Sequence, residues 1–411
     1  MSFKALFSRS LSADPQRLHF AAHSHHLWPD ASFEGHLNAW QDAAHLADRK
    51  WDKVMDEVWP EAQAHVAREL GAGEPSSIVF SSNTHDFLVR LAAAAPRSGG
   101  KLRVLTTDGE FHSARRQLAR WEEEGSLAVD RVAAEDFDSF PERFLAAAKA
   151  GKHDLILVSQ VLFGSGRIFD GLEELAALAR TEGPWVVVDG YHAFMAIPQP
   201  LAGGIEEQEL GSLPRQTDQA TSQPLAALGS TTSAFYLGGG YKYAMAGEGS
   251  AFLHAPVGFG PRPPVTGWFA EFEDLSLPPG SVGYAKDARR FLGATFDPSG
   301  LYRFNAVQRM LVENGLTTAA ISAHVLGLQL QLIGLIGRTL LGDAQLLNPL
   351  NGKPHARFLA FRSSNAQRWY EQLKGRNCIT DVRGDVLRIG FALYHDAADV
   401  DQLAAMLGQL A

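Results

Sequence analysis

The feature that most constrains the fold is a series of short apolar runs separated by amphipathic segments of helical length. The segments between them include residues 111–124 and 171–181. Continuous apolar strands between helices are typical of a parallel or mostly parallel sheet with both faces covered. The sequence therefore predicts an α/β core, whose first strands are residues 78–80, 102–106, 155–159 and 185–189.

The flanking regions follow other patterns. A helical pattern covers residues 32–70, and residues 203–230, rich in Gln, Gly, Ser, Thr and Pro, predict a long surface excursion. Apolar runs resume at residues 234–237 and 250–254, before a proline-rich connector. Beyond it the chain predicts a smaller α+β domain made of two long helices, strands at 358–361 and 386–390, and a closing helix at 397–409.

These patterns predict three regions. Residues 1–50 form an N-terminal segment that packs with the small domain, residues 51–290 form the large domain, and residues 291–411 form the small domain. A chain of 411 residues has room for two or three domains with substantial cores.

Charge and cysteine content exclude several classes of protein. The formal net charge of −9 argues against a nucleic-acid binder or a polybasic membrane protein, since both need a positive surface. The single cysteine, Cys378, excludes an internal disulfide and a cysteine-based zinc cluster. Residues 1–9 show no export signal, and the apolar stretch 321–341 carries polar residues spaced as in a buried helix. We expect a cytoplasmic protein.

Ligands of open α/β sheets bind at the carboxyl ends of the strands, so we examined the polar residues that follow each run. Ser81, Ser82, Asn83 and Thr84 follow the first run and precede a helix. Backbone N–H groups and hydroxyls at such a junction suit a phosphate, although a simple helix cap is the more common explanation of such residues.

Asp189 ends a buried strand, and His192 follows it. A buried acid is costly unless it meets a cation or a hydrogen-bond donor, such as a protonated ring nitrogen; a structural turn cap is the alternative. Lys242 lies in a glycine-rich, aromatic and otherwise uncharged stretch. Lost hydration would lower the pKa of its amine and make it a nucleophile toward an aldehyde, unless it is an ordinary exposed lysine.

Two further residues complete the pattern. Phe111, where a strand gives way to a helix, can lie flat on a planar ligand or belong to the core. Arg388, on an apolar strand, suits either a substrate carboxylate or a protein acid. Together, a phosphate cup, an aromatic plate, an acid, a lysine and an arginine match what pyridoxal 5′-phosphate and an amino acid require.

With these residues the chain resembles the aspartate-aminotransferase-like fold of pyridoxal-phosphate enzymes, and within it the class V aminotransferase group that includes kynureninase. Asp189-Gly-Tyr-His192 resembles the Asp-x-x-His of kynureninases, and Tyr241-Lys242-Tyr243 resembles their lysine motif. The resemblance implies a large domain with a mostly parallel seven-stranded sheet, a smaller C-terminal domain, and a homodimer with shared active sites.

The resemblance also implies roles for individual residues. Lys242, Tyr241 and Asp189 would be catalytic, with Lys242 covalently attached to the cofactor and Asp189 on its ring nitrogen. Substrate would meet His25, His45 and Arg388. The remaining cofactor contacts would be Asn83, Thr84, Phe111, Ser113, Ser165, His192, Trp268 and, from the partner subunit of the dimer, Thr295.

The chain departs from the family pattern at three places. Ala114 replaces the family's Asp, His112 replaces a Pro, and His23-Ser-His-His26 stands where the family has Asn-Ser-x-Gly. Bulky imidazoles there would reshape the substrate mouth. The implied reaction is kynureninase-like hydrolytic cleavage that releases alanine.

Other readings stay open at this point. A class V aminotransferase or another lyase would use the same cofactor and residues. Cysteine desulfurase chemistry is disfavoured because the only thiol lies near Arg388 rather than in a catalytic loop. A metal site on His23, His25, His26 and His36 lacks a recognised spacing.

Overall fold

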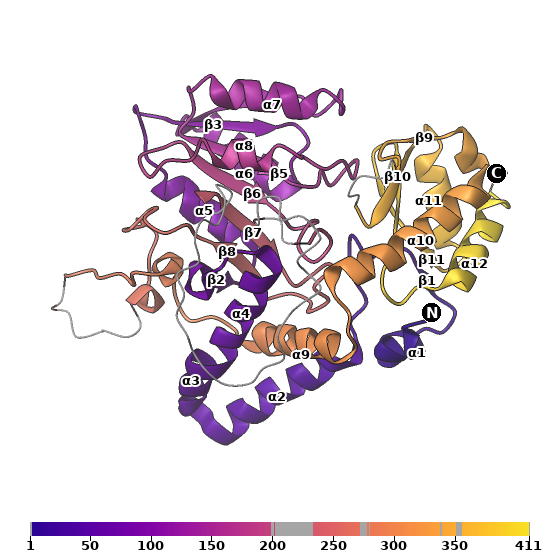
Figure 1. The fold of residues 1–411 in the computed structure, drawn as a ribbon, viewed down its shortest axis with the longest axis horizontal. Coiled ribbons are helices and arrows are strands. Elements are labelled where there is room, and N and C mark those ends of the chain that lie inside the picture. The colour runs from indigo at the N-terminus through magenta and orange to yellow at the C-terminus, as the bar shows by residue number, and fades with distance from the viewer. Residues whose placement is uncertain are drawn as a thin grey trace.

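The computed structural model describes residues 2–198, 201, 233–271, 278, 280–337, 339–350 and 356–410. The predicted excursion at 203–230 lies outside these residues. Within them the chain forms a large α/β region and a smaller C-terminal region, which lie side by side with α10 (Thr318–Ile336) running from one to the other (Figure 1).

The large region is built on a seven-stranded sheet in the order β2-β8-β7-β6-β5-β3-β4. Its strands are β2 (Ile78–Ser81), β3 (Leu102–Thr107), β4 (Leu127–Val132), β5 (Leu155–Ser159), β6 (Trp185–Asp189), β7 (Phe235–Gly239) and β8 (Ala251–His254). Strand β8 runs opposite to the other six strands of this sheet. The predicted mostly parallel seven-stranded sheet is confirmed.

Strand β4 is the one the apolar pattern missed. It pairs in parallel with β3 at the edge of the sheet, and Leu127 is its only buried residue. An edge strand needs no continuous apolar run because one of its sides meets solvent. By contrast, every residue of β5 is buried.

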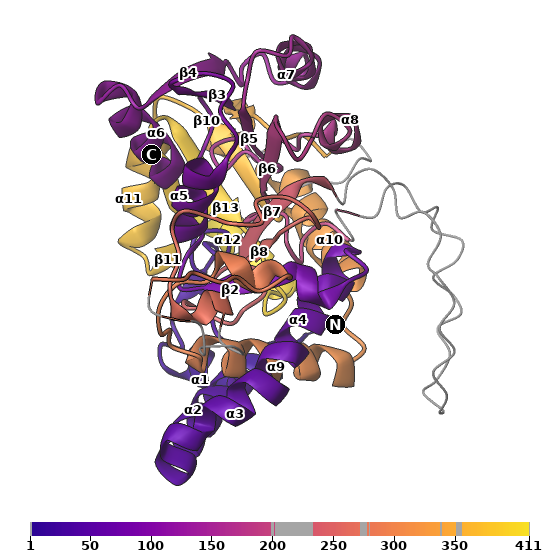
Figure 2. The same ribbon diagram turned by 90° about the vertical axis from the view of Figure 1, so that its left-hand side faces the viewer.

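Helices cover both faces of this sheet (Figure 2). The helices α5 (Thr84–Ala94) and α6 (His112–Glu123) lie on one side, and α7 (Phe140–Lys149) and α8 (Leu172–Ala176) lie on the other. Helices α5 and α6 begin within five residues of the ends of β2 and β3, so both begin near the carboxyl edge of the sheet. This arrangement brings the start of α5 and of α6 to the same edge as Asp189.

The predicted N-terminal helix is broken into several pieces. Helix α2 (Asp30–Leu46) ends where Ala47 takes a positive φ of 52°, and α3 (Lys50–Lys53) and α4 (Trp59–Leu70) follow with short 3-10 and π turns around them. Helix α2 packs against α9 (Ser299–Glu313). The 3.6-residue periodicity survives such breaks, so it could not reveal them.

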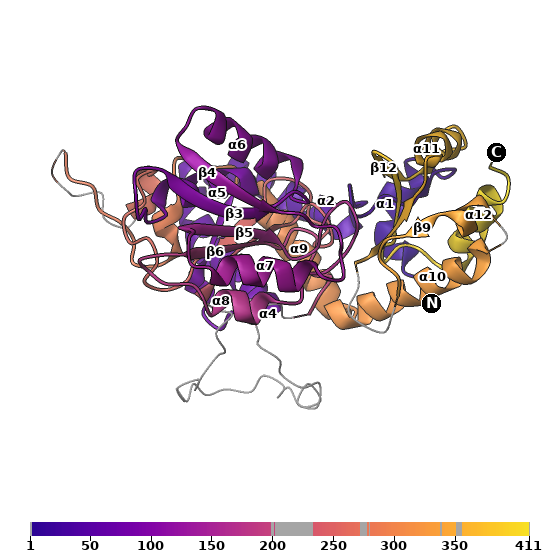
Figure 3. The ribbon, with the colours of Figure 1, turned by 90° about the horizontal axis from the view of Figure 1, so that it is seen from above.

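The C-terminal region lies beside the large region when seen from above (Figure 3). It holds a four-stranded antiparallel sheet in the order β12-β13-β10-β9. Its strands are β9 (Gln345–Leu346), β10 (Phe358–Arg362), β12 (Asp381–Arg383) and β13 (Val386–Gly390), flanked by α11 (Ala366–Lys374) and α12 (Ala397–Leu407). The N-terminal β1 (Leu18–His19) pairs with β11 (Cys378–Ile379), which joins the two ends of the chain. The short α1 (Ser8–Ser12) precedes it.

Helix α10 is long and apolar enough to cross a membrane by length and composition alone. It packs against α12, and Val325, Leu328, Leu332 and Ile336 belong to the core of the C-terminal region. Their spacing places them on one face, as expected for a core helix.

Candidate active site

The carboxyl ends of β2, β3, β6 and β7 meet at one edge of the large sheet and surround a cavity of about 620 Å³. Strand β13 of the C-terminal region closes it from the opposite side through Arg388. We call it the Lys242 cavity. Nine of the predicted site residues line it: Asn83, Thr84, Phe111, Ser113, Asp189, His192, Tyr241, Lys242 and Arg388.

Lys242 is only 8% exposed and follows β7 by three residues. Its Nζ lies 2.7 Å from Nε2 of His192. Burial lowers the pKa of Lys242 to about 7, against the opposing pull of the Asp189 carboxylate. A large fraction of the amine is therefore neutral near pH 7, as a nucleophile toward an aldehyde requires.

Asp189 ends β6 and lies beside the lysine. Its Oδ1 accepts a hydrogen bond of 3.0 Å from the backbone N–H of Tyr191. Burial raises the pKa of this carboxyl, while the Tyr191 hydrogen bond and the charge of Lys242 oppose the rise. A desolvated carboxylate of this kind favours a cationic partner such as a protonated ring nitrogen.

Asn83 caps α5, since its side chain accepts a hydrogen bond of 3.0 Å from the Asp86 backbone N–H. The helix-cap explanation of this residue is therefore correct. Thr84 begins the helix, and both residues also line the cavity. The positive end of α5 thus faces the cavity at the position proposed for a phosphate.

Phe111 is 40% exposed and is not a core residue. It precedes α6 and makes an edge contact with Phe163, whose ring centroid is 5.5 Å away. The Nζ of Lys242 lies 5.6 Å from the centroid of the Phe111 ring. A partly exposed aromatic face opposite the amine is suited to a planar ligand.

Arg388 is 2% exposed and forms an ion pair of 2.9 Å with Asp381, while its Nη1 donates to the Phe163 carbonyl at 2.5 Å. The protein-acid explanation therefore accounts for part of this side chain. Its Nε is buried without a hydrogen-bond partner among the described residues. That unpaired donor leaves capacity for an anionic ligand.

Tyr241 adjoins Lys242, and its hydroxyl lies 3.0 Å from Nδ1 of His25. Burial raises the pKa of the Tyr241 hydroxyl, so that it keeps its proton. His25 is exposed and does not line the cavity itself, but it reaches the cavity wall through this contact. The Tyr241 hydroxyl is therefore a proton donor at the cavity, and its contact with His25 links it to the exposed surface.

The remaining predicted residues do not line the Lys242 cavity. Ser165 is buried in the turn after β5, where its hydroxyl accepts a hydrogen bond from the Arg167 backbone N–H. Trp268, Thr295 and His45 are exposed on other surfaces of this chain. Within a single chain these three residues do not reach the cavity, so their predicted contacts stay predictions.

Residues that the sequence patterns did not single out also line the cavity. They are His85, Ser159, Val161, Phe163, Tyr191 and Arg383, while His23 and Ser24 belong to the segment that the resemblance placed at the substrate mouth. Ser159 ends β5 and pairs in register with Asp189, so the rule of strand ends could have found it. His23 arrives from the N-terminal segment and stacks on Phe358 at 4.7 Å, a long-range contact that no local pattern signals.

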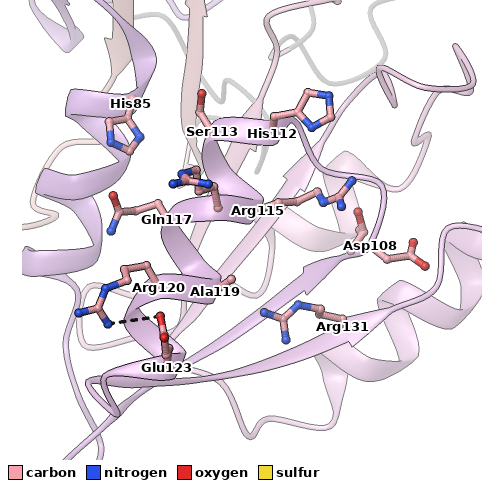
Figure 4. Close-up of a pocket in the computed structure, with 12 residues that line it drawn as sticks. His85, Asp108, His112, Ser113, Arg115, Gln117, Ala119, Arg120, Glu123 and Arg131 are labelled. Atoms are coloured by element: carbon pink, nitrogen blue, oxygen red, sulfur yellow. Dashed lines mark ion pairs between the residues drawn. The ribbon is translucent and has the colours of Figure 1, made fainter. Parts of the chain in front are cut away.

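A second, more open hollow of about 1130 Å³ adjoins the Lys242 cavity, because His85 and Ser113 line both. Figure 4 shows His85 on α5 opposite side chains of α6, with Arg131 of β4 at the far end. Arg120 pairs with Glu123 at 3.6 Å, and Arg131 pairs with Glu122 at 2.8 Å. Acids thus balance the arginines at the far end.

The alternative of a metal site receives no support from the described residues, in which no three His, Cys, Asp or Glu side chains converge. The four histidines of that alternative are separated. His23 stacks on Phe358, His25 contacts Tyr241, His26 bonds to the Leu27 carbonyl and His36 contacts Arg303.

The cavity fits pyridoxal 5′-phosphate by its donor set. The α5 N-terminus would hold the phosphate, Phe111 the ring face, Asp189 the ring nitrogen and Lys242 the aldehyde. Two observations support this fit. Burial lowers the pKa of the Lys242 amine, and burial raises the pKa of the Asp189 carboxyl beside it. The match uses residues from four separate strand ends.

Comparisons with protein families agree with this geometry. Residues 33–202 match the model named aminotransferase class-V, and residues 321–407 match the kynureninase C-terminal domain. Isopenicillin N epimerase from Streptomyces clavuligerus is 28% identical over 222 residues, which are 52% of this chain and 48% of that enzyme. The chain thus spans about half the length of this curated relative.

Several solved structures have similar folds at low sequence identity. The cystine C-S lyase C-DES, in complex with cysteine persulfide, has a TM-score of 0.74 and 14% identity, covering 96% of this chain and 98% of its own. A variant of that lyase carries glycine linked to its PLP cofactor. The cysteine desulfurase from Thermococcus onnurineus NA1 has a TM-score of 0.73 and 17% identity, covering 100% and 99%. This chain therefore has the aspartate-aminotransferase-like fold, and the donor set of its Lys242 cavity fits pyridoxal 5′-phosphate.

Proposed function

We propose that the protein is a pyridoxal-phosphate enzyme of the kynureninase type, which hydrolyses the bond between the β- and γ-carbons of an amino acid and releases alanine. The observation that carries the proposal is the Tyr241 hydroxyl, a proton donor beside Lys242 and 3.0 Å from His25. The match of residues 321–407 to the kynureninase C-terminal domain supports it.

The residues divide the work as follows. Bound pyridoxal phosphate supplies an electron sink for the charge left when the α-proton departs. The Lys242 amine, once free, takes that proton. Asp189 holds the protonated ring nitrogen, and Arg388 offers its unpaired Nε to the substrate carboxylate.

Cleavage consumes one water. The γ-carbon takes the hydroxyl and becomes a carboxylic acid, and the β-carbon takes a proton and becomes the methyl group of alanine. Tyr241 is placed to deliver that proton, and His25 connects its hydroxyl to the exposed surface. The other aromatic side chains of the cavity wall, Phe163 and Tyr191, favour an aromatic γ-acyl group.

The test is an assay of the holoenzyme on kynurenine and 3-hydroxykynurenine for release of alanine and an anthranilate. We expect Tyr241→Phe to slow the release about 10²-fold or more, as for loss of a general acid. Holoenzyme that binds these substrates without releasing an anthranilate would contradict the proposal.

A second candidate is an epimerase, aminotransferase or other lyase on the same cofactor. The specific observation in its favour is the 28% identity to isopenicillin N epimerase. It predicts α-proton exchange with solvent or a keto-acid half-reaction without carbon–carbon cleavage. A desulfurase is less well supported, because Cys378 is buried in β11 and burial raises the pKa of its thiol to about 12.

We further infer a homodimer that completes the site. Thr295, Trp268 and His45 are exposed and lie outside the Lys242 cavity of their own chain. A partner subunit that brings such residues to the cavity would account for all three. Light scattering should give twice the monomer mass, and Thr295→Ala should weaken cofactor binding by about tenfold without changing that mass.

A further inference from the structure

Glu110 is a fully buried carboxyl beneath the Lys242 cavity, and the proposed reaction does not use it. It lies in the turn between β3 and α6, and its side chain is 0% exposed. Burying a carboxyl costs free energy unless hydrogen bonds satisfy its oxygens.

Three hydrogen bonds surround this carboxyl. Its Oε1 accepts from the Thr107 hydroxyl at 2.8 Å and from the Ser159 backbone N–H at 3.1 Å. Its Oε2 accepts from the Ser159 hydroxyl at 2.5 Å. Two of the three donors belong to Ser159, which lines the cavity.

The charged surroundings of Glu110 come from neighbouring strands. Thr107 of β3 and Ser159 of β5 supply neutral donors, and Asp189 of β6 supplies a second carboxyl, with Lys242 beyond it. No ion pair to Glu110 occurs among the residues that the structure describes. Burial raises the pKa of Glu110 to about 7; its hydrogen bonds oppose the rise and repulsion from Asp189 adds to it.

The protonation state of Glu110 decides what Ser159 can offer to a ligand. When Glu110 is ionised, the Ser159 hydroxyl proton points to Oε2, so the oxygen presents only lone pairs to the cavity. When Glu110 carries a proton on Oε2, that proton can bond to the Ser159 oxygen. The hydroxyl proton of Ser159 is then free to turn toward the cavity.

We propose that Glu110 is a positioning residue that sets the hydrogen-bond direction of Ser159, and thereby whether the cavity floor beside Asp189 accepts or donates. The register places Ser159 directly opposite Asp189 on adjacent strands. The effect therefore acts where the cofactor ring nitrogen is to be held. This inference rests on the cofactor site and is independent of which amino acid the enzyme uses.

The test measures the affinity of the cofactor-free chain for pyridoxal 5′-phosphate at pH 6 and pH 8.5. The chains are the wild type, Glu110→Gln, Ser159→Ala and the double variant. We expect Glu110→Gln to change the ratio of the two affinities by about three- to tenfold, the equivalent of one hydrogen bond. In the Ser159→Ala background the same substitution should leave the ratio unchanged.

Glu69→Gln is the matched control. Glu69 is another carboxyl whose pKa is raised by burial, and it accepts a hydrogen bond from Thr318 rather than from a cavity residue. It should leave the affinity ratio as in the wild type. Equal changes from Glu110→Gln in both backgrounds, or no change in either, would overturn the proposal.

A folding defect would not hide the answer. If Glu110→Gln fails to fold, Thr107→Val removes one donor from the same carboxyl and should shift the pH at which the affinity changes upward, because an ionised Glu110 is then less well stabilised. No shift in that variant would count against the proposal. Failure of the kynurenine assay would leave this measurement unaffected.

Discussion

The amine of Lys242 lies 2.7 Å from Nε2 of His192, and both side chains are buried at the cavity floor. Burial lowers the pKa of His192 well below its usual range, so the ring is neutral. The same Nε2 lies 3.1 Å from the His23 carbonyl, so the ring tautomer sets the direction of its hydrogen bond with the amine, and a neutral ring adds no second charge. The pair therefore orients the lysine nitrogen while leaving it a nucleophile.

The lowered pKa of Lys242 predicts a pH profile for cofactor attachment. With the pKa at about 7, the neutral fraction of the amine is nearly complete at pH 9 and falls about tenfold for each pH unit below 7. Covalent trapping of pyridoxal phosphate by borohydride, at short times and at pH 5 to 9, should follow this curve. A midpoint near 10 would show instead an ordinary exposed lysine.

Replacement of Lys242 by alanine should abolish covalent attachment and lower turnover by about 10³-fold or more. The measurement is the absorbance of the purified holoenzyme before and after borohydride, together with the rate of substrate consumption. Lys152→Ala, at an exposed lysine away from the cavity, is the control and should behave as the wild type. Retained borohydride-stable label in Lys242→Ala would place the attachment elsewhere.

Arg388→Gln should raise KM for the amino acid about 10- to 100-fold, since a charge-assisted hydrogen bond to the substrate carboxylate is lost. Asp381 keeps an ion pair of 3.2 Å with Arg383, so its charge stays partly balanced. The cofactor spectrum should not change. Arg368→Gln, at an exposed position of α11, is the control. If KM is unchanged, Arg388 serves only the ion pair with Asp381.

Gly390→Ala should destabilise the protein by about 1–3 kcal/mol, as overpacking of a filled site does. A methyl group at Gly390 would lie 2.1 Å from Nδ1 of His23, so this imidazole must move from its place in the cavity wall. Urea unfolding measures the free energy. Gly327→Ala is the control, because nothing lies within 4 Å of a methyl group there and the residue is in α10.

Gly327→Ala itself should raise stability by up to about 1 kcal/mol, because alanine has the higher helix propensity. The opposite signs of the two glycine variants separate packing from backbone effects. Equal changes in the free energy of unfolding in the two variants would show that the His23 ring moves aside with little loss of stability.

Much of the core could be predicted because its signal is local. Buried parallel strands such as β5 and β6 read as continuous apolar runs, and Asp189 stands out because an acid at the end of such a run needs a partner. The glycine-rich, aromatic setting of Lys242 likewise marks a dehydrated amine. The edge strand β4 and the breaks after α2 escaped because exposed residues there carry no strict pattern.

The sequence by itself thus determined the α/β core, six of its seven strands and the cofactor that the strand ends would hold. Only the tertiary structure decided which side chains meet around the cavity. His23 stacks on Phe358, and Glu110 accepts a hydrogen bond from Ser159. Arg388 pairs with Asp381 and keeps its own Nε unpaired. The contacts of His23 and of Glu110 join residues far apart in sequence, and the Arg388–Asp381 pair joins two adjacent strands. The periodicity of a sequence shows which face of a helix or strand is buried. Which side chains that face contacts is decided by how the large and C-terminal regions pack together.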